Sequence, residues 1–437
     1  MKKFFSTIRN IFAIEELRTR ILNTIWFLII FRLGSFVVLP GVDSSKLQDA
    51  SGIFGFIDIF LGGAFSRASI FALGIMPYIS ASIVLQLLTV AVPYFQKLQK
   101  EGESGRKKIT QITRVLTIAI TLAQSGAYLS TTIPAEAIGL DPFLFKIASM
   151  IILTAGTIFC MWLGEKITDK GIGNGISMLI MIGIIARLPK DLFFEISTKG
   201  MSGALLTIIE IIALFFVVMG VVMLTQATRR IPVQYAKQVI GNKVYGGQRQ
   251  YIPLKVNSSG VMPIIFAQSL MFLPALISGL WSDSSDIANY IGSTFSNIFS
   301  WQYNLVFGIM IILFTFFYTA ITVNPNQIAD DMKRNGGFIP GVKPGKQTSE
   351  FIDNILSKIT LPGSIFLAIV AVIPAFATMA GVTQGFAQFY GGTSLLIMVG
   401  VILDTLQQIE SYLLMRHYEG MMKSGKIKGR SQNAAVA

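Results

Sequence analysis

Ten stretches of the chain are apolar over nearly the length needed to cross a membrane. They are residues 23–39, 71–92, 115–133, 148–164, 172–187, 204–224, 261–281, 304–323, 361–380 and 393–415. About 20 mostly apolar residues in a helix span the roughly 30 Å hydrocarbon core of a bilayer. Backbone polar groups cannot stay unpaired in lipid, so such runs are predicted to be helical. The pattern predicts an all-α polytopic membrane protein with ten transmembrane helices.

A shorter apolar segment precedes the second run. Residues 53–66 (IFGFIDIFLGGAFS) are interrupted by an aspartate and two glycines. Such a length fits a re-entrant or buried half-helix and not a span. The second run itself contains Gly74 and Pro77, which leave backbone groups to be satisfied by neighbouring helices or by a cavity. A broken helix beside a re-entrant segment indicates a pore or a binding site.

Composition and charge agree with lipid as the solvent. Hydrophobic residues make up 52% of the chain and charged residues only 14%, with a net charge of +13. Of the 36 lysines and arginines, 28 lie in the segments that share a side with the N-terminus, and 6 lie in the opposite segments. By the positive-inside rule, this asymmetry places both termini in the cytoplasm.

The same runs predict how the chain is divided. We expect a cytoplasmic N-terminal segment (1–22), a half with five spans (23–200), a second half with five spans (201–415) and a cytoplasmic tail (416–437). The second half contains two large polar loops, 225–258 and 324–350. Five spans in each half permit an inverted repeat, although residue patterns alone do not demonstrate one.

The sequence contains little that indicates a catalytic site or a metal site. The single cysteine, Cys160, and the single histidine, His417, exclude a disulfide within the chain and argue against a Cys/His metal site. Cys160 lies in an apolar run and is expected to be a small buried hydrophobe. The glycines of GIGNG (171–175) weakly resemble a nucleotide-binding pattern. No strand precedes them and no phosphate-binding lysine follows, which favours a helix-breaking loop. We therefore predict no enzyme, no cofactor and no metal.

Ionisable side chains inside the apolar runs leave a second class of membrane protein, the secondary transporters, as an alternative. Arg32, Glu210 and Asp404 lie in such runs, where ionisable groups are functional hypotheses by default. A secondary transporter of a small solute would use such groups for coupling. We favour structural pairing, because three scattered charges are a thin basis for a coupling pathway. A membrane scaffold without transport activity is the third alternative.

Six segments resemble the SecY family of translocation channels. They are ASIFALGIMPYISASIVLQLL (68–88), EGESGRKKITQITR (101–114), GIGNGIS (171–177), IPLKVNSSGVMPIIFA (252–267), FFYTAITVNPNQIADDMKRNGGFIPGVKPG (316–345) and FYGGTSLLI (389–397). They follow the family's order over nearly the whole chain, and the second segment is similar to bacterial members.

The resemblance implies a fold and a function. The expected fold has two pseudo-symmetric five-helix halves around a central pore closed by a re-entrant plug. The expected function is to pass unfolded secretory polypeptides across the bacterial plasma membrane and to release hydrophobic segments laterally into lipid. SecA or a translating ribosome would drive transport. SecE and SecG would be membrane subunits, signal-bearing preproteins the substrates, and YidC and SecD/SecF further candidate partners.

The family's functional positions map onto residues of this chain. The expected pore ring is Ile75, Ile79, Ile184, Ile265 and Ile397. The expected plug covers about 54–68 and includes Phe54, Phe60, Gly62, Gly63 and Ser66. The expected polar cluster of the lateral gate is Ser80, Gln124 and Asn257. The expected cytoplasmic partner-binding residues are Arg229, Arg230, Lys237, Lys243, Arg249 and Lys343.

Two positions depart from the family pattern. Lys343 stands where relatives commonly have arginine, and Asn242-Lys243 stands where an arginine pair is common. Lysine keeps the charge but lacks the planar bidentate fork, so arginine-specific contacts do not carry over. The implied aliphatic ring also weighs against a solute transporter, which should gather polar groups near the bilayer midplane.

Overall fold

Long helices dominate the part of the chain that the structure describes. The computed structural model describes residues 12, 14–47, 58, 60–139, 141–200, 203–235, 238–240, 243–245, 249–268, 270–271, 294 and 297–423. The long helices are α2 (Glu15–Gly34), α4 (Met76–Ala91), α6 (Glu103–Thr132), α7 (Pro142–Lys170), α8 (Gly175–Lys199), α9 (Ala204–Gln226), α12 (Trp301–Thr322), α14 (Lys346–Met379) and α16 (Gly392–Lys423). Each lies at one predicted run, and residues 262–268 are helical at the start of the seventh.

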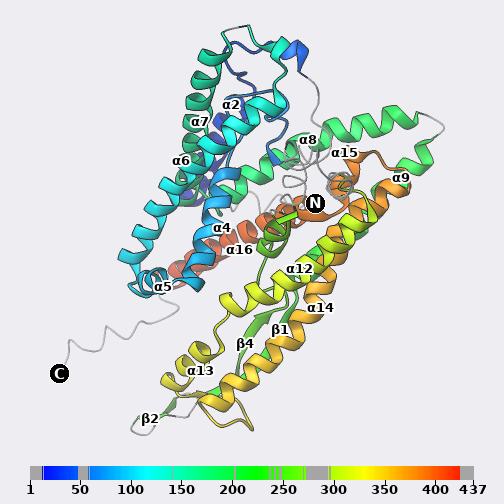
Figure 1. Cartoon of the computed structure of the whole chain (residues 1–437). Coiled ribbons are helices and arrows are strands. Elements are labelled where there is room, and N and C mark those ends of the chain that lie inside the picture. Colours follow the sequence, from blue (N-terminus) through cyan, green and yellow to red (C-terminus); the bar gives the residue numbers. More distant parts are fainter. Residues whose placement is uncertain are drawn as a thin grey trace.

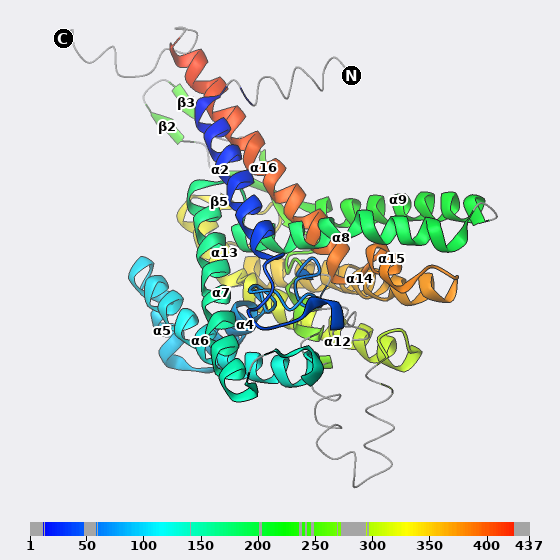
Figure 2. The same cartoon turned by 90° about the horizontal axis from the view of Figure 1, so that it is seen from above.

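The helices form two groups. Figure 1 shows α2, α6 and α7 on one side, α9, α12 and α14 on the other, and α16 between the groups. Figure 2 shows from above that α2 and α16 run side by side, and a contact of Arg20 with the Tyr412 ring (5.3 Å to the centroid) joins them. Residues from both halves of the sequence therefore meet along α16.

Fewer helices than ten qualify as membrane spans on length and hydropathy alone. In the described residues six do so, and the pair α4 and α5 (Pro93–Lys100), bent by 100°, would make a seventh. The helices α2 and α8 are long enough, but each contains several charged residues, and much of run seven lies outside the described residues. The chain is a multi-pass membrane protein, and the count of ten stays a prediction.

Several helices extend beyond the apolar runs. The predicted loop 93–114 is mostly helical, because it contains α5 and the first turns of α6. The helix α14 begins at Lys346, well before the apolar run at 361. Apolar length marks only the stretch that lipid requires, whereas amphipathic turns outside it are stabilised by packing.

The two large polar loops fold together and contain strands, which the all-α prediction omitted. β1 (Thr228–Tyr235) pairs antiparallel with β4 (Arg249–Lys255), and β5 (Gly337–Phe338) pairs with the end of β1. β2 (Gln238–Ile240) and β3 (Lys243–Tyr245) form a separate hairpin. Ile231, Val233 and Leu254 are buried against residues of α13 (Pro325–Arg334) and α14. The loops thus form one unit, at the lower end of Figure 1.

Short elements complete the description. They are η1 (Ser44–Lys46), η2 (Ala135–Ala137), α15 (Gln384–Ala387) and η4 (Gln388–Tyr390). The candidate plug is helical at Asp58 and Phe60 and then runs through consecutive turns over 61–68. Gly62 (φ 63°) and Gly63 (φ 85°) adopt the left-handed conformation that favours glycine. The half-helix interpretation of 53–66 is therefore wrong for residues 61–66, although these residues are largely buried.

Candidate functional site

Three of the five predicted ring residues lie in one apolar cluster. Ile184 of α8 and Ile397 of α16 are buried (0% and 4% exposed) in this cluster, and Ile265 of the helical residues 262–268 packs against the cluster. Phe60 of the candidate plug belongs to the same cluster. The cluster therefore joins the candidate plug segment to helices from both halves of the chain.

The other two ring residues lie in an adjoining cluster. Ile75 is the N-cap residue of α4 and is buried, and Ile79 lies one turn further along. Both pack among residues of α2, α7 and α8, including Phe31 and Leu179. The structure thus brings the five isoleucines into two neighbouring groups, which meet at α8.

A glycine contact seats the candidate plug on α8. A Cβ atom added to Gly183 would lie 2.2 Å from the carbonyl oxygen of Phe60, so only glycine permits this approach. Gly183 directly precedes the ring residue Ile184. Five residues after Phe60 in the same segment, the Phe65 carbonyl oxygen accepts a hydrogen bond from the Tyr128 hydroxyl of α6 at 2.7 Å.

An ion pair fixes the same segment one turn further along α8. Arg187 donates through Nη1 to Asp58 Oδ2 at 2.7 Å, and the Asp58 side chain is 4% exposed. The Ser66 hydroxyl and backbone N–H also donate to the Asp58 carboxylate, at 2.7 Å and 3.0 Å. Arg32 and Arg67 both donate to the Gly62 carbonyl oxygen, at 3.1 Å and 3.0 Å. Phe54 lies outside the described residues.

The predicted polar cluster makes local hydrogen bonds. Ser80 donates to the Met76 carbonyl oxygen of its own helix at 3.2 Å, and Asn257 accepts from Ser259 at 3.3 Å. Gln124 is half-buried on α6. In the described part of the chain, no hydrogen bond joins these three side chains to one another.

A different polar pair crosses between the two halves. Tyr318 of α12 donates to Gln86 Oε1 of α4 at 3.3 Å. Phe266 packs against this position, with its ring 6.1 Å from that of Tyr318. Sequence reasoning missed the pair, and the only signal was an amide side chain within an apolar run.

The predicted partner-binding residues gather on the unit of strands. Arg229 and Arg230 are exposed on β1, and Lys343 is exposed in the segment between β5 and α14. Lys243 lies on β3, and Arg249 begins β4. Lys237 and Asn242 lie outside the described residues. The two basic loops therefore meet on one unit.

Two ionisable residues of the apolar runs are paired structurally, as predicted. Arg32 donates a hydrogen bond to the Gly62 carbonyl oxygen of the candidate plug, and Glu210 of α9 forms an ion pair with Lys199 at the end of α8. Lys199 also pairs with Glu195 at 2.5 Å, whereas Asp404 is exposed.

Two further predictions are confirmed by local geometry. Cys160 is fully buried. In the GIGNG loop, the Asn174 side chain caps α8, and Gly173 N–H donates to Gln408 of α16 at 2.8 Å. This loop joins helices, as the helix-breaking interpretation expected.

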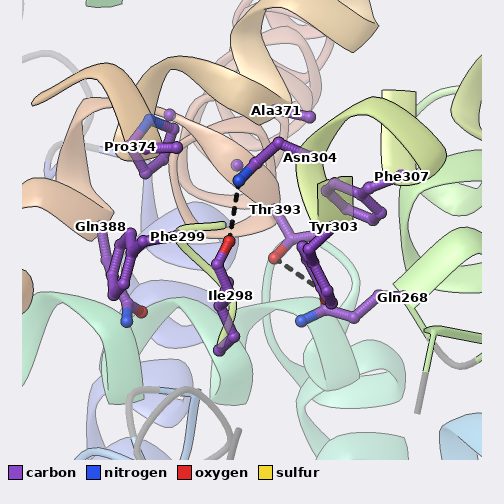
Figure 3. A pocket seen from close by; sticks show the side chains of 13 residues that line it. Gln268, Ile298, Phe299, Tyr303, Asn304, Phe307, Ala371, Pro374, Gln388 and Thr393 are labelled. Atoms are coloured by element: carbon purple, nitrogen blue, oxygen red, sulfur yellow. Dashed lines mark hydrogen bonds between the residues drawn. The ribbon is translucent and has the colours of Figure 1, made fainter. Parts of the chain in front are cut away.

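One small cavity lies between α12, α14 and the segment leading into α16. Figure 3 shows Tyr303, Asn304, Gln388, Thr393 and Gln268 around it. Asn304 donates to the Ile298 carbonyl oxygen at 2.8 Å, and Thr393 donates to Gln268 at 3.3 Å. The cavity volume of about 30 Å³ accommodates a water molecule or two and no larger solute. Among the described residues, no cluster of His, Cys, Asp or Glu is arranged to hold a metal ion.

Comparisons with known proteins agree on one family. The sequence model of SecY matches residues 69–406. The protein translocase subunit SecY of Streptomyces scabiei is 44% identical over 94% of this chain and 98% of its own length. The subunit of the same name from Mycobacterium bovis is 40% identical over 97% of this chain and all of its own length.

Solved structures share the fold. One described as a protein conducting channel superimposes with a TM-score of 0.64 at 17% identity, over 90% of this chain and 92% of its own. An idle yeast Ssh1 complex bound to the 80S ribosome superimposes with a TM-score of 0.59 at 15% identity, over 96% of this chain and 94% of its own.

Proposed function

The chain belongs to the SecY family, and from this premise we propose how its residues form a gated path for polypeptides. It is a channel-forming subunit for protein translocation and not an enzyme. The family match and the names of its relatives support this function, and the solved channel structures share its fold. The solute-transporter alternative has no support from these relatives. The proposal concerns the constriction, the plug, the lateral gate, the partners and the orientation in the membrane.

We propose that Ile75, Ile79, Ile184, Ile265 and Ile397 form the constriction. The observation that carries the proposal is the single cluster in which Ile184, Ile265 and Ile397 pack with Phe60. Branched aliphatic side chains offer water no hydrogen-bond partner, so a narrow bore lined by them dewets and excludes ions. Such side chains also conform to any translocating sequence, because no specific polar contact must be broken.

The segment from Asp58 to Ser66 is proposed as the plug that closes the path. Its backbone lies against Gly183, next to Ile184, and its aspartate is paired with Arg187. Gly62 and Gly63 permit the turns that bring it there. The plug would add a second seal to the aliphatic constriction.

The lateral gate is proposed to lie between α4 and α6 on one side and α12 with residues 257–268 on the other. The hydrogen bond between Tyr318 and Gln86 supports this location, because it crosses from one half to the other. Ser80, Gln124 and Asn257 would set the polarity of the same seam. Interhelical hydrogen bonds in membranes are worth roughly 0.6–2 kcal/mol each, so a few of them can tune how hydrophobic a signal must be.

The unit of strands is proposed as the cytoplasmic docking surface. Exposed Arg229, Arg230 and Lys343 lie on it, and the fold neighbours include a ribosome-bound complex. Arginine and lysine contacts to ribosomal RNA phosphates weaken as salt rises. The same charges complement acidic patches on a motor such as SecA. SecE and SecG are the proposed membrane subunits.

The orientation follows from the distribution of basic residues. We infer ten spans in a bacterial plasma membrane, with both termini in the cytoplasm. This orientation places the unit of strands on the side from which a ribosome or a motor would deliver the preprotein.

Changing Ile79, Ile265 and Ile397 together to Asn tests the constriction. Hydrated side chains in the bore should make the purified channel leak ions and should admit preproteins with defective signals. The matched control changes Ile208, Ile209 and Ile212 of α9 to Asn, since these isoleucines are exposed on the chain (56%, 57% and 50%) and lie outside both isoleucine clusters. Wild-type conductance and wild-type signal stringency in the constriction variant would remove the ring from the proposal.

A further inference from the structure

Arg187 lies between two carboxylates that belong to different parts of the structure. Its Nη1 atom is 2.7 Å from Asp58 Oδ2 of the plug segment, and its Nε atom is 3.8 Å from Asp191 Oδ2. Asp191 is on the same helix as Arg187, four residues later, so the second pair stays together when the plug moves. The first pair does not.

The two carboxylates differ in how well they are satisfied. Asp58 accepts from Arg187, from the Ser66 hydroxyl and from the Ser66 backbone N–H. Asp191 Oδ2 is buried and has no hydrogen-bond partner, because 3.8 Å to Arg187 is too long for a hydrogen bond. Its side chain is only 9% exposed. A buried carboxylate oxygen without a donor is unusual, and here a guanidinium lies within one small rotation of it.

Displacement of the plug changes this balance. Asp58 and Ser66 belong to the same segment, so the hydrogen bonds between them travel with it. Arg187 stays on α8, where its side chain is 20% exposed, and it would lose its main partner. Leaving a largely buried charge without a partner costs much free energy, so the loss of Asp58 would strongly disfavour the displaced state of the plug. Asp191 offers Arg187 a replacement without any movement of the helix.

Other charged groups nearby do not take this role. Arg32 and Arg67 donate to the Gly62 carbonyl oxygen, and as cations they cannot replace a carboxylate as the partner of Arg187. Lys190 is exposed and precedes Asp191 in the chain. Asp191 is therefore the carboxylate left on α8 beside Arg187 once Asp58 departs.

We propose that Arg187 is a two-position switch, which pairs with Asp58 while the plug is seated and with Asp191 when the plug is displaced. The inference rests on the proposed plug and names the residues that regulate it. A switch of this kind gives both states a satisfied arginine, so opening costs an exchange of partners instead of the loss of one. Arg187, Asp58 and Asp191 are positioning residues and need not touch the translocating chain.

The two carboxylates should respond in opposite directions to the same change. Asp58→Asn removes the partner of the seated state, so the channel should leak ions and accept weaker signals. Asp191→Asn removes the partner of the displaced state and leaves Arg187 wholly to Asp58, so weak signals should be exported less well than by wild type. We expect ion conductance in Asp58→Asn to rise, and export of weak signals by Asp191→Asn to fall, by about fivefold or more, which is the usual size of a coupling between two states. If both carboxylates had only a structural role, the two variants would shift ion conductance and signal stringency in the same direction as each other.

The experiment uses the full chain with its co-purifying membrane subunits, and it measures ion conductance without preprotein and export of a series of signals of graded hydrophobicity. Asp404→Asn is the matched control, because Asp404 is exposed on α16. The exchange Asp58→Arg with Arg187→Asp should restore the seal. Asp191→Ser serves as a second variant if Asp191→Asn does not accumulate.

Shifts in the same direction, or Asp191 variants that match wild type, would overturn the switch. If the wild-type chain itself neither seals nor exports, the proposed function fails. If wild type does both and the variants do not differ from it, only the switch fails.

Discussion

The contact between Gly183 and the plug segment allows a test that changes no charge. A Cβ atom at position 183 would lie 2.2 Å from the Phe60 carbonyl oxygen, whereas ordinary contact begins at 3.4 Å. Gly183→Ala must therefore widen this separation by about 1.2 Å. The turns of the plug segment can yield more readily than α8, which packs against α7 and α16.

The expected size of the effect follows from the packing. Overpacking by one methyl group in a tightly packed site costs about 1–3 kcal/mol. If the strain is relieved when the plug leaves, the ratio of displaced to seated plug rises roughly 5- to 150-fold, at 1.4 kcal/mol for each factor of ten. We expect the variant to show more frequent ion conductance in planar bilayers without preprotein, and to export preproteins with weakened signals.

Gly308→Ala on α12 is the matched control. The nearest atom to a Cβ at Gly308 is the Ala368 Cβ at 3.9 Å, which is ordinary contact. Both substitutions raise helix propensity by roughly 0.5–1 kcal/mol, so a difference between them isolates the clash with the plug. A Gly183→Ala channel that seals as tightly as wild type and the control would refute the proposed seat of the plug.

Two further outcomes are expected at the docking surface and the gate. Changing Arg229 and Arg230 to Glu should weaken ribosome and SecA binding by at least tenfold at low salt while membrane insertion is unchanged, and unaltered affinity across a salt series would contradict the docking surface. Asn257→Leu removes a polar group at the gate and should shift the hydrophobicity at which signals are accepted; sorting of graded signals as in wild type would exclude Asn257 from the gate.

The sequence predicted the helices better than the contacts between them. Apolar runs are local patterns, and helices lie at the places they indicated. The strands were missed because β1 buries only Ile231 and Val233, too short an alternation to stand out beside a polar loop. The family resemblance supplied the ring, and the structure places Ile184, Ile265 and Ile397 in one cluster.

Long-range pairs could not be predicted from local pattern. Asp58 and Arg187 are 129 residues apart, and Tyr318 and Gln86 are 232 apart. Each of these side chains looks like an isolated polar group in an apolar stretch until the helices are packed. The predicted polar cluster differs from these long-range pairs. Ser80 and Asn257 make hydrogen bonds within their own segments and not across the gap between them.

The most direct measurement is whether a polypeptide in transit touches the constriction. A photoreactive amino acid in place of Ile184 or Ile397 should crosslink to a preprotein arrested during export, because both side chains lie in the cluster that meets the plug. The same amino acid in place of Ile209, which is 57% exposed on α9, should crosslink to lipid and not to the preprotein. We expect preprotein adducts at positions 184 and 397 that require both the motor and an intact signal. Adducts at position 209 with none at 184 and 397 would contradict a path between the isoleucines.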